Sequence, residues 1–285
     1  MNGRTVLITG ASRGLGEYLA KRFWEAGYSL VLVARNGDAL ASVANSLEKR
    51  KQQTCILFPC DLGSHLEISK LIADVKARLP RLDVLIHNAA IHGPIGPLAE
   101  NDLALWNAAM QINFLSPVAL TQGLIPFLAQ HGGGSIIGLS GGGATGPRAN
   151  FSAYASSKVA LVRFCETLSQ ETKSLAIRVN CIAPGAMKTA LLGEVLAQGQ
   201  VAAGEREFGI ANQVFNEGGA SMDQVAKLAL FLAGNQSVGI TGKLISAVWD
   251  RWEQWPEHLA ELSQSDAYTL RRITGRERGF NWGDK

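Results

Sequence analysis

The sequence lacks several features that would place it in a specialised class of protein. No apolar run approaches the ~20 residues that a membrane-spanning helix needs, and the longest runs, such as 29–34 and 135–139, are strand-sized. The 27 basic and 24 acidic residues are spread along the chain without a Lys/Arg cluster, so we expect no nucleic-acid or membrane partner. No C-x-x-C pair occurs, and we expect buried free thiols at Cys55, Cys60, Cys165 and Cys181.

The chain is instead rich in apolar residues, which make up 47% of its 285 residues and suffice for a large core. A strand pattern begins at Arg4 with no signal-peptide pattern ahead of it. We therefore expect a soluble, cytoplasmic protein.

Short apolar runs alternate with longer amphipathic stretches along residues 4–248. Strands that are apolar on both faces and separated by helices are typical of a parallel sheet covered on both sides. We predict an α/β fold, a single domain with a Rossmann-like, doubly wound parallel sheet. The expected strands are 5–9, 29–34, 54–59, 83–87, 135–139, 176–182 and 243–248, and the expected helices are 14–26, 37–50, 64–78, 102–129, 152–173 and 221–233.

Two segments depart from this alternation. Residues 185–220 are rich in Gly, Ala and Gln with weak periodicity, so we expect a mobile helical excursion or lid near a binding site. The tail carries Trp249, Trp252, Trp255 and Trp282 among balanced charges, which is too aromatic for a solvated linker. We predict a main domain over 1–250 and a C-terminal extension over 251–285 that packs on this domain or on a neighbouring subunit.

A glycine-rich turn, Thr9-Gly10-Ala11-Ser12-Arg13-Gly14-Leu15-Gly16, follows the first expected strand. Gly10 permits a tight turn, Gly14 lets the backbone approach a pyrophosphate, and Gly16 allows close packing of helix on sheet. Amides at the start of the next helix would point at the phosphates, with the positive end of the helix dipole behind them. In this position the turn predicts a dinucleotide-binding site in the 1–250 domain.

The end of the second expected strand bears on which dinucleotide binds. An acidic residue there would hydrogen-bond the adenosine ribose and repel a 2′-phosphate, but Ala34-Arg35-Asn36 contains none. Arg13 in the glycine turn could bring a second cation to the same place. The sequence therefore favours NADP(H), with NAD(H) as the alternative. Asp61, after the third strand, is a candidate partner of the adenine amino group.

Tyr154 and Lys158 lie four residues apart on an expected helix, so their side chains share one face. A free tyrosine has a pKa of about 10 and is a poor acid–base catalyst at neutral pH, whereas a nearby ammonium group favours the phenolate. Ser140 ends the fifth expected strand, at the edge where open α/β sheets bind ligands, and its hydroxyl could hold a carbonyl oxygen.

Together these motifs resemble the short-chain dehydrogenase/reductase family, with a similarity to 3-oxoacyl-carrier-protein reductases. Six motifs follow the family order and cover residues 5 to about 245. They are Thr9 to Gly16, Asn88-Ala89-Ala90, Asn113, Ser140, Tyr154 with Lys158, and Pro184-Gly185 with Thr189.

The resemblance implies an NADP(H)-dependent oxidoreductase that transfers a hydride between nicotinamide and a carbonyl or secondary alcohol. By it, Tyr154 is the general acid/base, Ser140 orients the substrate oxygen, and Lys158 lowers the tyrosine pKa and binds the nicotinamide ribose. Asn113 would fix a water in a proton relay, and Thr189 with the backbone after Pro184 would hold the carboxamide. The expected catalytic residues are Asn113, Ser140, Tyr154 and Lys158, the expected cofactor-binding residues are Gly10, Ser12, Arg13, Gly14, Leu15, Gly16, Arg35, Asp61, Leu62, Asn88, Ala89, Tyr154, Lys158, Pro184, Gly185 and Thr189, and no metal is expected.

Other functions fit the residues less well. Gly138 to Gly142 matches the G-x-S-x-G elbow of hydrolases, but a loop with a proline follows, and the only later histidine past the loop is His258. Nucleotide-sugar epimerases usually carry an acid after the second strand, which is absent here. An NAD-dependent alcohol dehydrogenase of the same family is the main alternative, and a non-catalytic dinucleotide sensor would typically lack Tyr154 or Lys158.

Two positions depart from the family pattern. Ala90 replaces a glycine, and the usual Asp-Gly-Gly ending is absent, since the chain continues through residues 246–252. Family members often form tetramers with C-terminal segments at their contacts. We expect a homodimer or homotetramer that acts on a small-molecule carbonyl or alcohol. Acyl thioesters, steroids, sugars, polyketides and small ketones all stay open as substrates.

Overall fold

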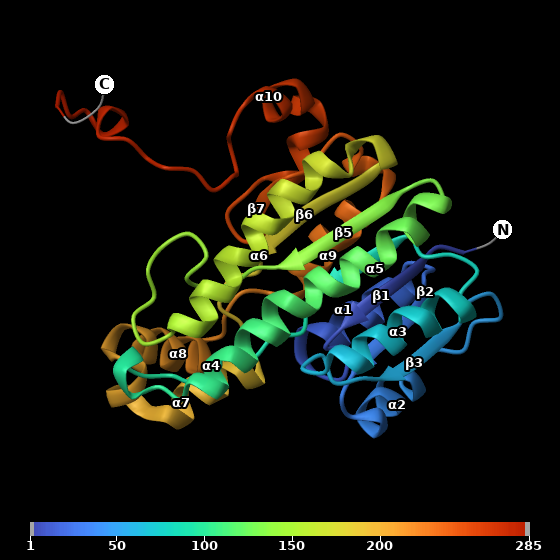
Figure 1. Ribbon diagram of the computed structural model, residues 1–285, viewed down its shortest axis with the longest axis horizontal. Coiled ribbons are helices and arrows are strands. Elements are labelled where there is room, and N and C mark those ends of the chain that lie inside the picture. Colours follow the sequence, from blue (N-terminus) through green and yellow to red (C-terminus); the bar gives the residue numbers. More distant parts are fainter. Residues whose placement is uncertain (1–2, 283–285) are drawn as a thin grey trace.

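The computed structural model describes residues 3–282, and residues 1–2 and 283–285, at the outer ends of the expected 1–250 and 251–285 segments, lie outside the described residues. Seven parallel strands form one sheet in the order β3-β2-β1-β4-β5-β6-β7. This confirms the predicted Rossmann-like sheet (Figure 1). The strands are β1 (Thr5–Thr9), β2 (Ser29–Ala34), β3 (Cys55–Pro59), β4 (Val84–His87), β5 (Gly134–Leu139), β6 (Ile177–Ala183) and β7 (Leu244–Ser246).

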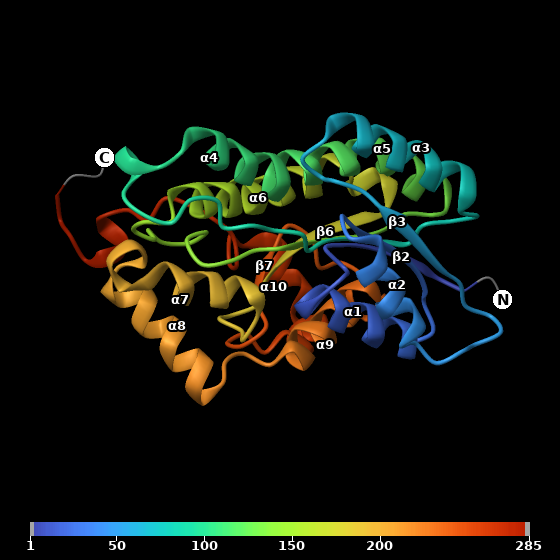
Figure 2. The same cartoon turned by 90° about the horizontal axis from the view of Figure 1, so that it is seen from below.

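Helices cover both faces of the sheet, as Figure 2 shows, with α3, α5 and α6 on one side and α1, α2 and α9 on the other. Because side chains alternate along a strand, Leu7 packs with the first set of helices and Ile8 with the second. The helices are α1 (Gly14–Glu25), α2 (Gly37–Asn45), α3 (His65–Arg78), α4 (Leu103–Met110), α5 (Ser116–Gln130), α6 (Ser152–Glu171), α7 (Ala190–Ala203), α8 (Glu205–Glu217), α9 (Met222–Ala233) and α10 (Leu259–Gln264).

The expected helix 102–129 is interrupted by a π-helical turn, Gln111–Leu115, between α4 and α5. The whole run Leu103–Gln130 is long and apolar enough to cross a membrane by length and composition. The expectation that no segment approaches that length was therefore wrong. Leu120, Leu124 and Leu128 are fully buried in the core, and the run packs on α3 and α6. In this structure the run packs as a core helix of the domain.

The expected excursion at 185–220 forms two helices, α7 and α8, at one end of the sheet (Figure 2). A non-helical residue, Gly199, with φ of 78°, breaks α7 near its end. Buried Val195 and Ala211 pack with Phe151 and Tyr154 in a small separate apolar cluster. The two helices thus form a lid that rests on the start of α6.

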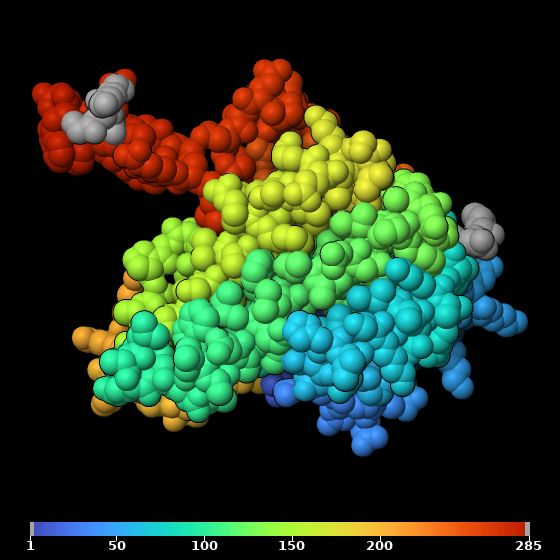
Figure 3. Space-filling model, viewed as in Figure 1, coloured from blue at the N-terminus to red at the C-terminus, as the bar shows by residue number. Residues whose placement is uncertain are grey.

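The tail after β7 divides into a packed part and an exposed part. Trp252 and Trp255 are only 6% and 5% exposed and belong to the core on the α1–α9 side of the sheet, so this core includes residues on both sides of position 250. Trp249 and Trp282 are 86% and 71% exposed. Two of the four tail tryptophans therefore pack and two do not. Figure 3 shows the last described residues, in red, standing away from the body of the molecule.

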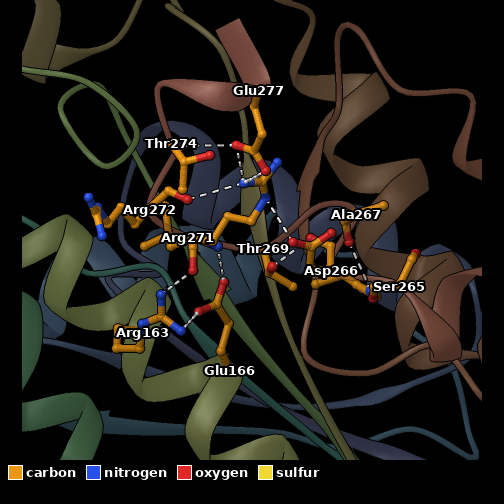
Figure 4. Close-up of polar contacts among 12 residues, drawn as sticks. Arg163, Glu166, Ser265, Asp266, Ala267, Thr269, Arg271, Arg272, Thr274 and Glu277 are labelled. Carbon is orange, nitrogen blue, oxygen red and sulfur yellow. Dashed lines mark hydrogen bonds and ion pairs between the residues drawn. The ribbon is translucent and has the colours of Figure 1, made fainter. Parts of the chain in front are cut away.

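Between its packed part and its exposed part, the tail is held against α6 by polar contacts (Figure 4). The backbone N–H of Leu270 donates to the Glu166 carboxylate at 2.7 Å. Arg163 donates to the Leu270 carbonyl and pairs with the other Glu166 oxygen at 2.8 Å. Lys243, the residue before β7, donates to the carbonyl of Ala267 at 2.8 Å and so holds the same stretch.

Candidate active site

The glycine-rich turn joins β1 to α1, as the sequence predicts. Gly10 and Gly14 have φ of 65° and 57°, in the region that favours glycine. A Cβ on Gly16 would collide with the Gly10 carbonyl oxygen, so Gly16 is needed for close packing of the turn. A Cβ on Gly14 would meet only Thr189, at 4.0 Å, and the start of α1 has no side-chain cap. The first amides of α1 are therefore available to a ligand.

Thr9 and Asn88 lock this turn against the end of β4. The Thr9 hydroxyl accepts from the amides of Asn88 and Ala89 at 3.0 and 3.1 Å. The Asn88 side-chain amide donates back to the carbonyls of Thr9 and Gly10 at 2.9 and 3.2 Å. Asn88 thus fixes the position of the turn.

One cavity of about 500 Å³ opens at the carboxyl end of the sheet, where parallel α/β sheets bind ligands. It reaches from the glycine turn to the start of α6. The expected residues that line it are Gly10, Ser12, Arg13, Gly14, Leu15, Gly16, Arg35, Asp61, Leu62, Asn88, Ala89, Ser140, Tyr154, Lys158, Pro184 and Thr189. The structure therefore brings the two halves of the predicted site together.

Ser140, Tyr154 and Lys158 meet at the inner end of this cavity. The Ser140 hydroxyl is buried and has no hydrogen-bond partner among the described residues. Lys158 is 2% exposed, its Nζ donates to the Leu139 carbonyl at 2.7 Å, and this nitrogen lies 5.5 Å from the centre of the Tyr154 ring. A Cβ on Gly141 would collide with the Tyr154 hydroxyl, so only glycine leaves room for it.

Burial dominates the protonation of this group. It raises the pKa of Tyr154, while the positive charge of Arg148 lowers it. Burial lowers the pKa of Lys158 from 10.5 to about 8. His87, buried behind the site and bonded to Thr121 at 2.8 Å, has its pKa lowered to about 3 by burial and by Lys158, so it is neutral. Arg148 is the cation whose charge opposes the effect of burial on the Tyr154 pKa. The expected role of Lys158 in lowering this pKa stays a prediction.

Two expected site residues do not line the cavity. The Asn113 amide accepts from the Ile91 N–H at 2.9 Å and donates to the Ile91 carbonyl and to Ser157 at 2.8 and 2.9 Å. It lies in the π-turn, which is an uncommon local structure often found at functional sites. Gly185 has φ of 78° and turns the chain beside Ala220 and Val248. Both residues shape the neighbouring backbone.

Two residues that the sequence did not single out for the site, His92 and Arg148, lie beside Tyr154. The ring centres of His92 and Tyr154 are 4.9 Å apart, and His92 Nδ1 lies 3.2 Å from a carboxylate oxygen of Glu194 in α7. The Arg148 guanidinium carbon lies 5.5 Å from the Tyr154 ring centre. Both residues sit in loops between family motifs, so no spacing rule identifies them. What the sequence does show is that both residues lie in loops that follow β4 and β5, and loops held by a rigid scaffold often carry binding residues.

Of the four cysteines, Cys60 alone lines the cavity. All four cysteines are free thiols, of which Cys55 is half-buried and the others are buried. Burial raises the pKa of Cys55 and of Cys60 to about 11, so neither thiol is reactive at neutral pH. Within residues 3–282, no group of three His, Cys, Asp or Glu side chains could hold a metal ion.

Comparisons with known proteins agree with this geometry. Residues 4–200 match the family model described as short chain dehydrogenase. The chain is 34% identical to the uncharacterized oxidoreductase YciK of Escherichia coli K12 over 67% of this chain and 76% of that protein. It is 33% identical to a fatty acyl-CoA reductase of Acinetobacter baylyi over 67% of this chain, but the match spans only 65% of that relative.

Among solved structures, a short chain dehydrogenase from Escherichia coli CFT073 complexed with NADPH superposes with a TM-score of 0.73. The two chains are 30% identical, and the match covers 87% of this chain and 98% of the other.

Proposed function

The chain belongs to the short-chain dehydrogenase family of oxidoreductases, and on that premise we propose that it transfers a hydride between NADP(H) and a carbonyl or secondary alcohol. One observation carries the proposal. A single cavity is lined both by the glycine turn and by Ser140, Tyr154 and Lys158. A phosphate-binding turn and an acid–base group in one cavity can serve one reaction.

The residues present fit a dinucleotide. The uncapped start of α1 and the open face of Gly14 suit a phosphate, because amides there have no protein partner to displace. The unpartnered, buried Ser140 hydroxyl suits a polar ligand atom, since a buried hydroxyl without a partner is otherwise costly. Thr189 and Pro184 line the same cavity and could contact the carboxamide end.

When bound, NADP(H) supplies or accepts the hydride. In the reducing direction, the Tyr154 hydroxyl donates its proton to the substrate oxygen, and in the oxidising direction the phenolate takes the proton back. The Ser140 hydroxyl donates a hydrogen bond to the same oxygen and so orients it. Lys158, held by the Leu139 carbonyl, keeps a donor close to the tyrosine.

Two exposed arginines support NADP(H) over NAD(H). Arg13 and Arg35 both line the cavity, and no acidic residue stands at the end of β2 to repel a 2′-phosphate. Asn36 is occupied as the cap of α2, where its side-chain oxygen accepts from the Ala39 N–H at 2.9 Å. The solved neighbour complexed with NADPH supports binding of a dinucleotide of this kind in the family.

Fluorescence titration of the purified protein with NADPH and NADH in parallel tests the cofactor assignment. We expect tight binding of NADPH and weak binding of NADH. The reverse order would overturn the argument from the two arginines and favour a NAD-dependent alcohol dehydrogenase. Binding of neither would revive a role without catalysis.

The substrate side of the cavity favours a molecule with an apolar part. Ile91, Met187 and Leu191 line the cavity. Behind them, Leu192, Leu196 and Phe208 of α7 and α8 pack against the apolar cluster that contains Tyr154. A screen of ketones and aldehydes that differ in the length of their apolar part should therefore give KM values that fall as that part grows. KM values independent of length would contradict this assignment.

We also propose that the enzyme is a homodimer or homotetramer. Leu103, Leu105 and Leu115 are 68%, 54% and 42% exposed along the run from α4 through the π-turn, which is costly for a surface facing water alone. Light scattering coupled to size-exclusion chromatography should give a mass two or four times that of one 30.4 kDa chain. A monomeric mass would overturn the proposal.

A further inference from the structure

Arg148 occupies a position that no family motif assigns. It lies in the loop between β5 and α6, and its side chain is only 14% exposed. The guanidinium carbon stacks 3.8 Å from the centre of the Phe151 ring and lies 5.5 Å from that of Tyr154. Such contacts between a guanidinium and an aromatic face hold the cation in place.

The backbone of the loop leaves space for this side chain. A Cβ on Gly142 would lie 3.6 Å from Arg148 Cδ, and a Cβ on Gly143 would collide with Ala155 of α6. Gly143 also has φ of 94°, which favours glycine. The loop can therefore fold down over α6 with Arg148 directed at the aromatic rings.

The lid holds the other side of the guanidinium. Arg148 Nε donates to the Glu207 carboxylate of α8 at 2.7 Å, and the Glu207 side chain is 16% exposed. The pair is largely removed from water, so separating it would leave a poorly solvated charge on each side. Glu207 lies 59 residues from Arg148 in the sequence, so the pair ties α8 to the loop between β5 and α6.

Other charged or titratable groups face Tyr154 from each neighbouring element. Lys158 lies on the same helix, with Nζ 5.5 Å from the Tyr154 ring centre. His92 lies in the loop after β4, paired with Glu194 of α7, and is charged only when protonated. His87 lies deeper and is neutral. A guanidinium keeps its charge in proteins, whereas burial lowers the pKa of the Lys158 ammonium to about 8.

We propose that Arg148 is a positioning residue for Tyr154, and that Glu207 of the lid holds its guanidinium against the tyrosine ring when the lid is closed. The permanent charge then favours the phenolate over the phenol at the moment the site is shut. When α8 lifts, the guanidinium loses its partner and is free to turn toward water. Lid closure therefore sets the acid strength of the group that exchanges a proton with the substrate.

The direct test is the titration of the Tyr154 phenol, which needs no substrate. The chain has only four tyrosines, so subtracting the near-ultraviolet titration of Tyr154→Phe isolates one phenol. We expect Arg148→Gln to lower the phenolate fraction at a fixed alkaline pH by about ten-fold, because a unit charge at this distance is poorly screened. Arg148→Lys should restore part of it. An unchanged titration in Arg148→Gln would overturn the proposal.

Glu207→Gln tests the role of the lid. If Glu207 holds the guanidinium in place, Arg148→Gln should lower the phenolate fraction by less in the Glu207→Gln background than in the wild type. Comparing the two backgrounds cancels the direct effect that the negative charge of Glu207 has on Tyr154. Hydrogen exchange across α7 and α8 should then rise in both variants. No difference between the backgrounds and no change in hydrogen exchange would show that stacking on Phe151 alone holds Arg148, and would overturn the part of the proposal that involves the lid. Arg206→Gln, an exposed neighbour on α8, is the matched control.

The turnover test rests on the proposed function and is separable from the titration. With an active carbonyl substrate, Arg148→Gln should shift the pH profile of kcat in the direction of the phenol titration, with the Kd for NADPH unchanged. Failure to find any substrate would count against the proposed function and leave the phenol titration standing. A shifted phenol with an unshifted kcat profile would overturn the positioning role.

Discussion

The glycine turn at the β1–α1 end of the cavity is shaped by its own backbone, whereas the surroundings of Tyr154 at the other end are built by side-chain contacts between distant parts of the chain. Gly10, Gly14 and Gly16 shape the first end through their own conformations and contacts. The second end depends on Arg148–Glu207 and His92–Glu194, whose partners are 59 and 102 residues apart. Local sequence therefore specifies the first end, and the tertiary fold assembles the second.

Among changes near Tyr154, we expect the largest effect from removing the phenol hydroxyl itself. Tyr154→Phe keeps the ring in its packing but removes the proton that the substrate oxygen exchanges. We expect turnover to fall by about 10³-fold, the usual contribution of a positioned acid–base group, while the Kd for NADPH stays within a few-fold of wild type. Steady-state rates and fluorescence titration measure the two effects, and Tyr268→Phe, in the exposed tail, is the control. Substantial turnover in Tyr154→Phe would sink the assigned mechanism.

Lys158→Met should change turnover and the free energy of unfolding in opposite directions, because Lys158 serves the site but is costly to bury. Folding lowers the Lys158 pKa from 10.5 to about 8, so below about pH 8 the fold bears the cost of a buried charge, up to about 3 kcal/mol. Between these two pKa values the unfolded chain binds more protons, and stability rises with pH.

The variant should lose that rise and gain about 2 kcal/mol of unfolding free energy at pH 7, since the Leu139 carbonyl also loses its partner. Denaturant melts between pH 7 and 10 measure both effects, with Lys173→Met, exposed just beyond α6, as the control. An undiminished rise with pH would assign it to another group. Turnover should be lost as well.

Gly16→Ala breaks the first end. The added methyl would collide with the Gly10 carbonyl and lie 2.6 Å from the Asn88 side-chain amide. We expect a loss of about 2 kcal/mol in unfolding free energy from this overpacking, together with weaker NADPH binding. Gly193→Ala in α7 is the matched control, because a Cβ there meets nothing within 4 Å. Equal stability of the two variants would show that the turn tolerates a side chain.

Arg35→Asp is the mildest change, since it alters charge at the rim and leaves the backbone alone. We expect the ratio of NADPH to NADH affinity to fall by about ten-fold or more, because a carboxylate at this strand end accepts from ribose hydroxyls and repels a 2′-phosphate. Parallel fluorescence titrations measure the ratio, and Lys51→Asp, also exposed, is the control. A ratio that does not move would remove Arg35 from the cofactor argument.

The contrast between local sequence and tertiary packing also explains how much of the fold and of the site could be predicted from the sequence. The strands lie within a few residues of their expected positions, because buried parallel strands read directly as apolar runs. The lining positions of the glycine turn also follow from the sequence. The π-turn at Asn113, the break at Gly199 and the pair Arg148–Glu207 were not predicted. Each depends on what packs against the segment, which hydrophobic periodicity along the chain does not record.

The tail illustrates the same limit. Its four tryptophans look alike in sequence, yet Trp255 is 5% exposed and Trp249 is 86% exposed. Composition indicated that the extension packs somewhere, and only the fold distinguishes the tryptophans that enter the core from those that do not.

The anchoring of the tail on α6 has a practical consequence for any recombinant version of this enzyme. Glu166 binds the Leu270 amide from the same helix that carries Tyr154 and Lys158. A stop codon or a protease cut ahead of position 270 would remove this hydrogen-bond donor from a buried carboxylate whose pKa burial already raises. None of the tail residues that the structure describes after position 250 lines the cavity. A purification tag placed after the tail would therefore follow residues that lie outside the cavity, whereas trimming the chain ahead of position 270 would destabilise the helix that carries Tyr154 and Lys158.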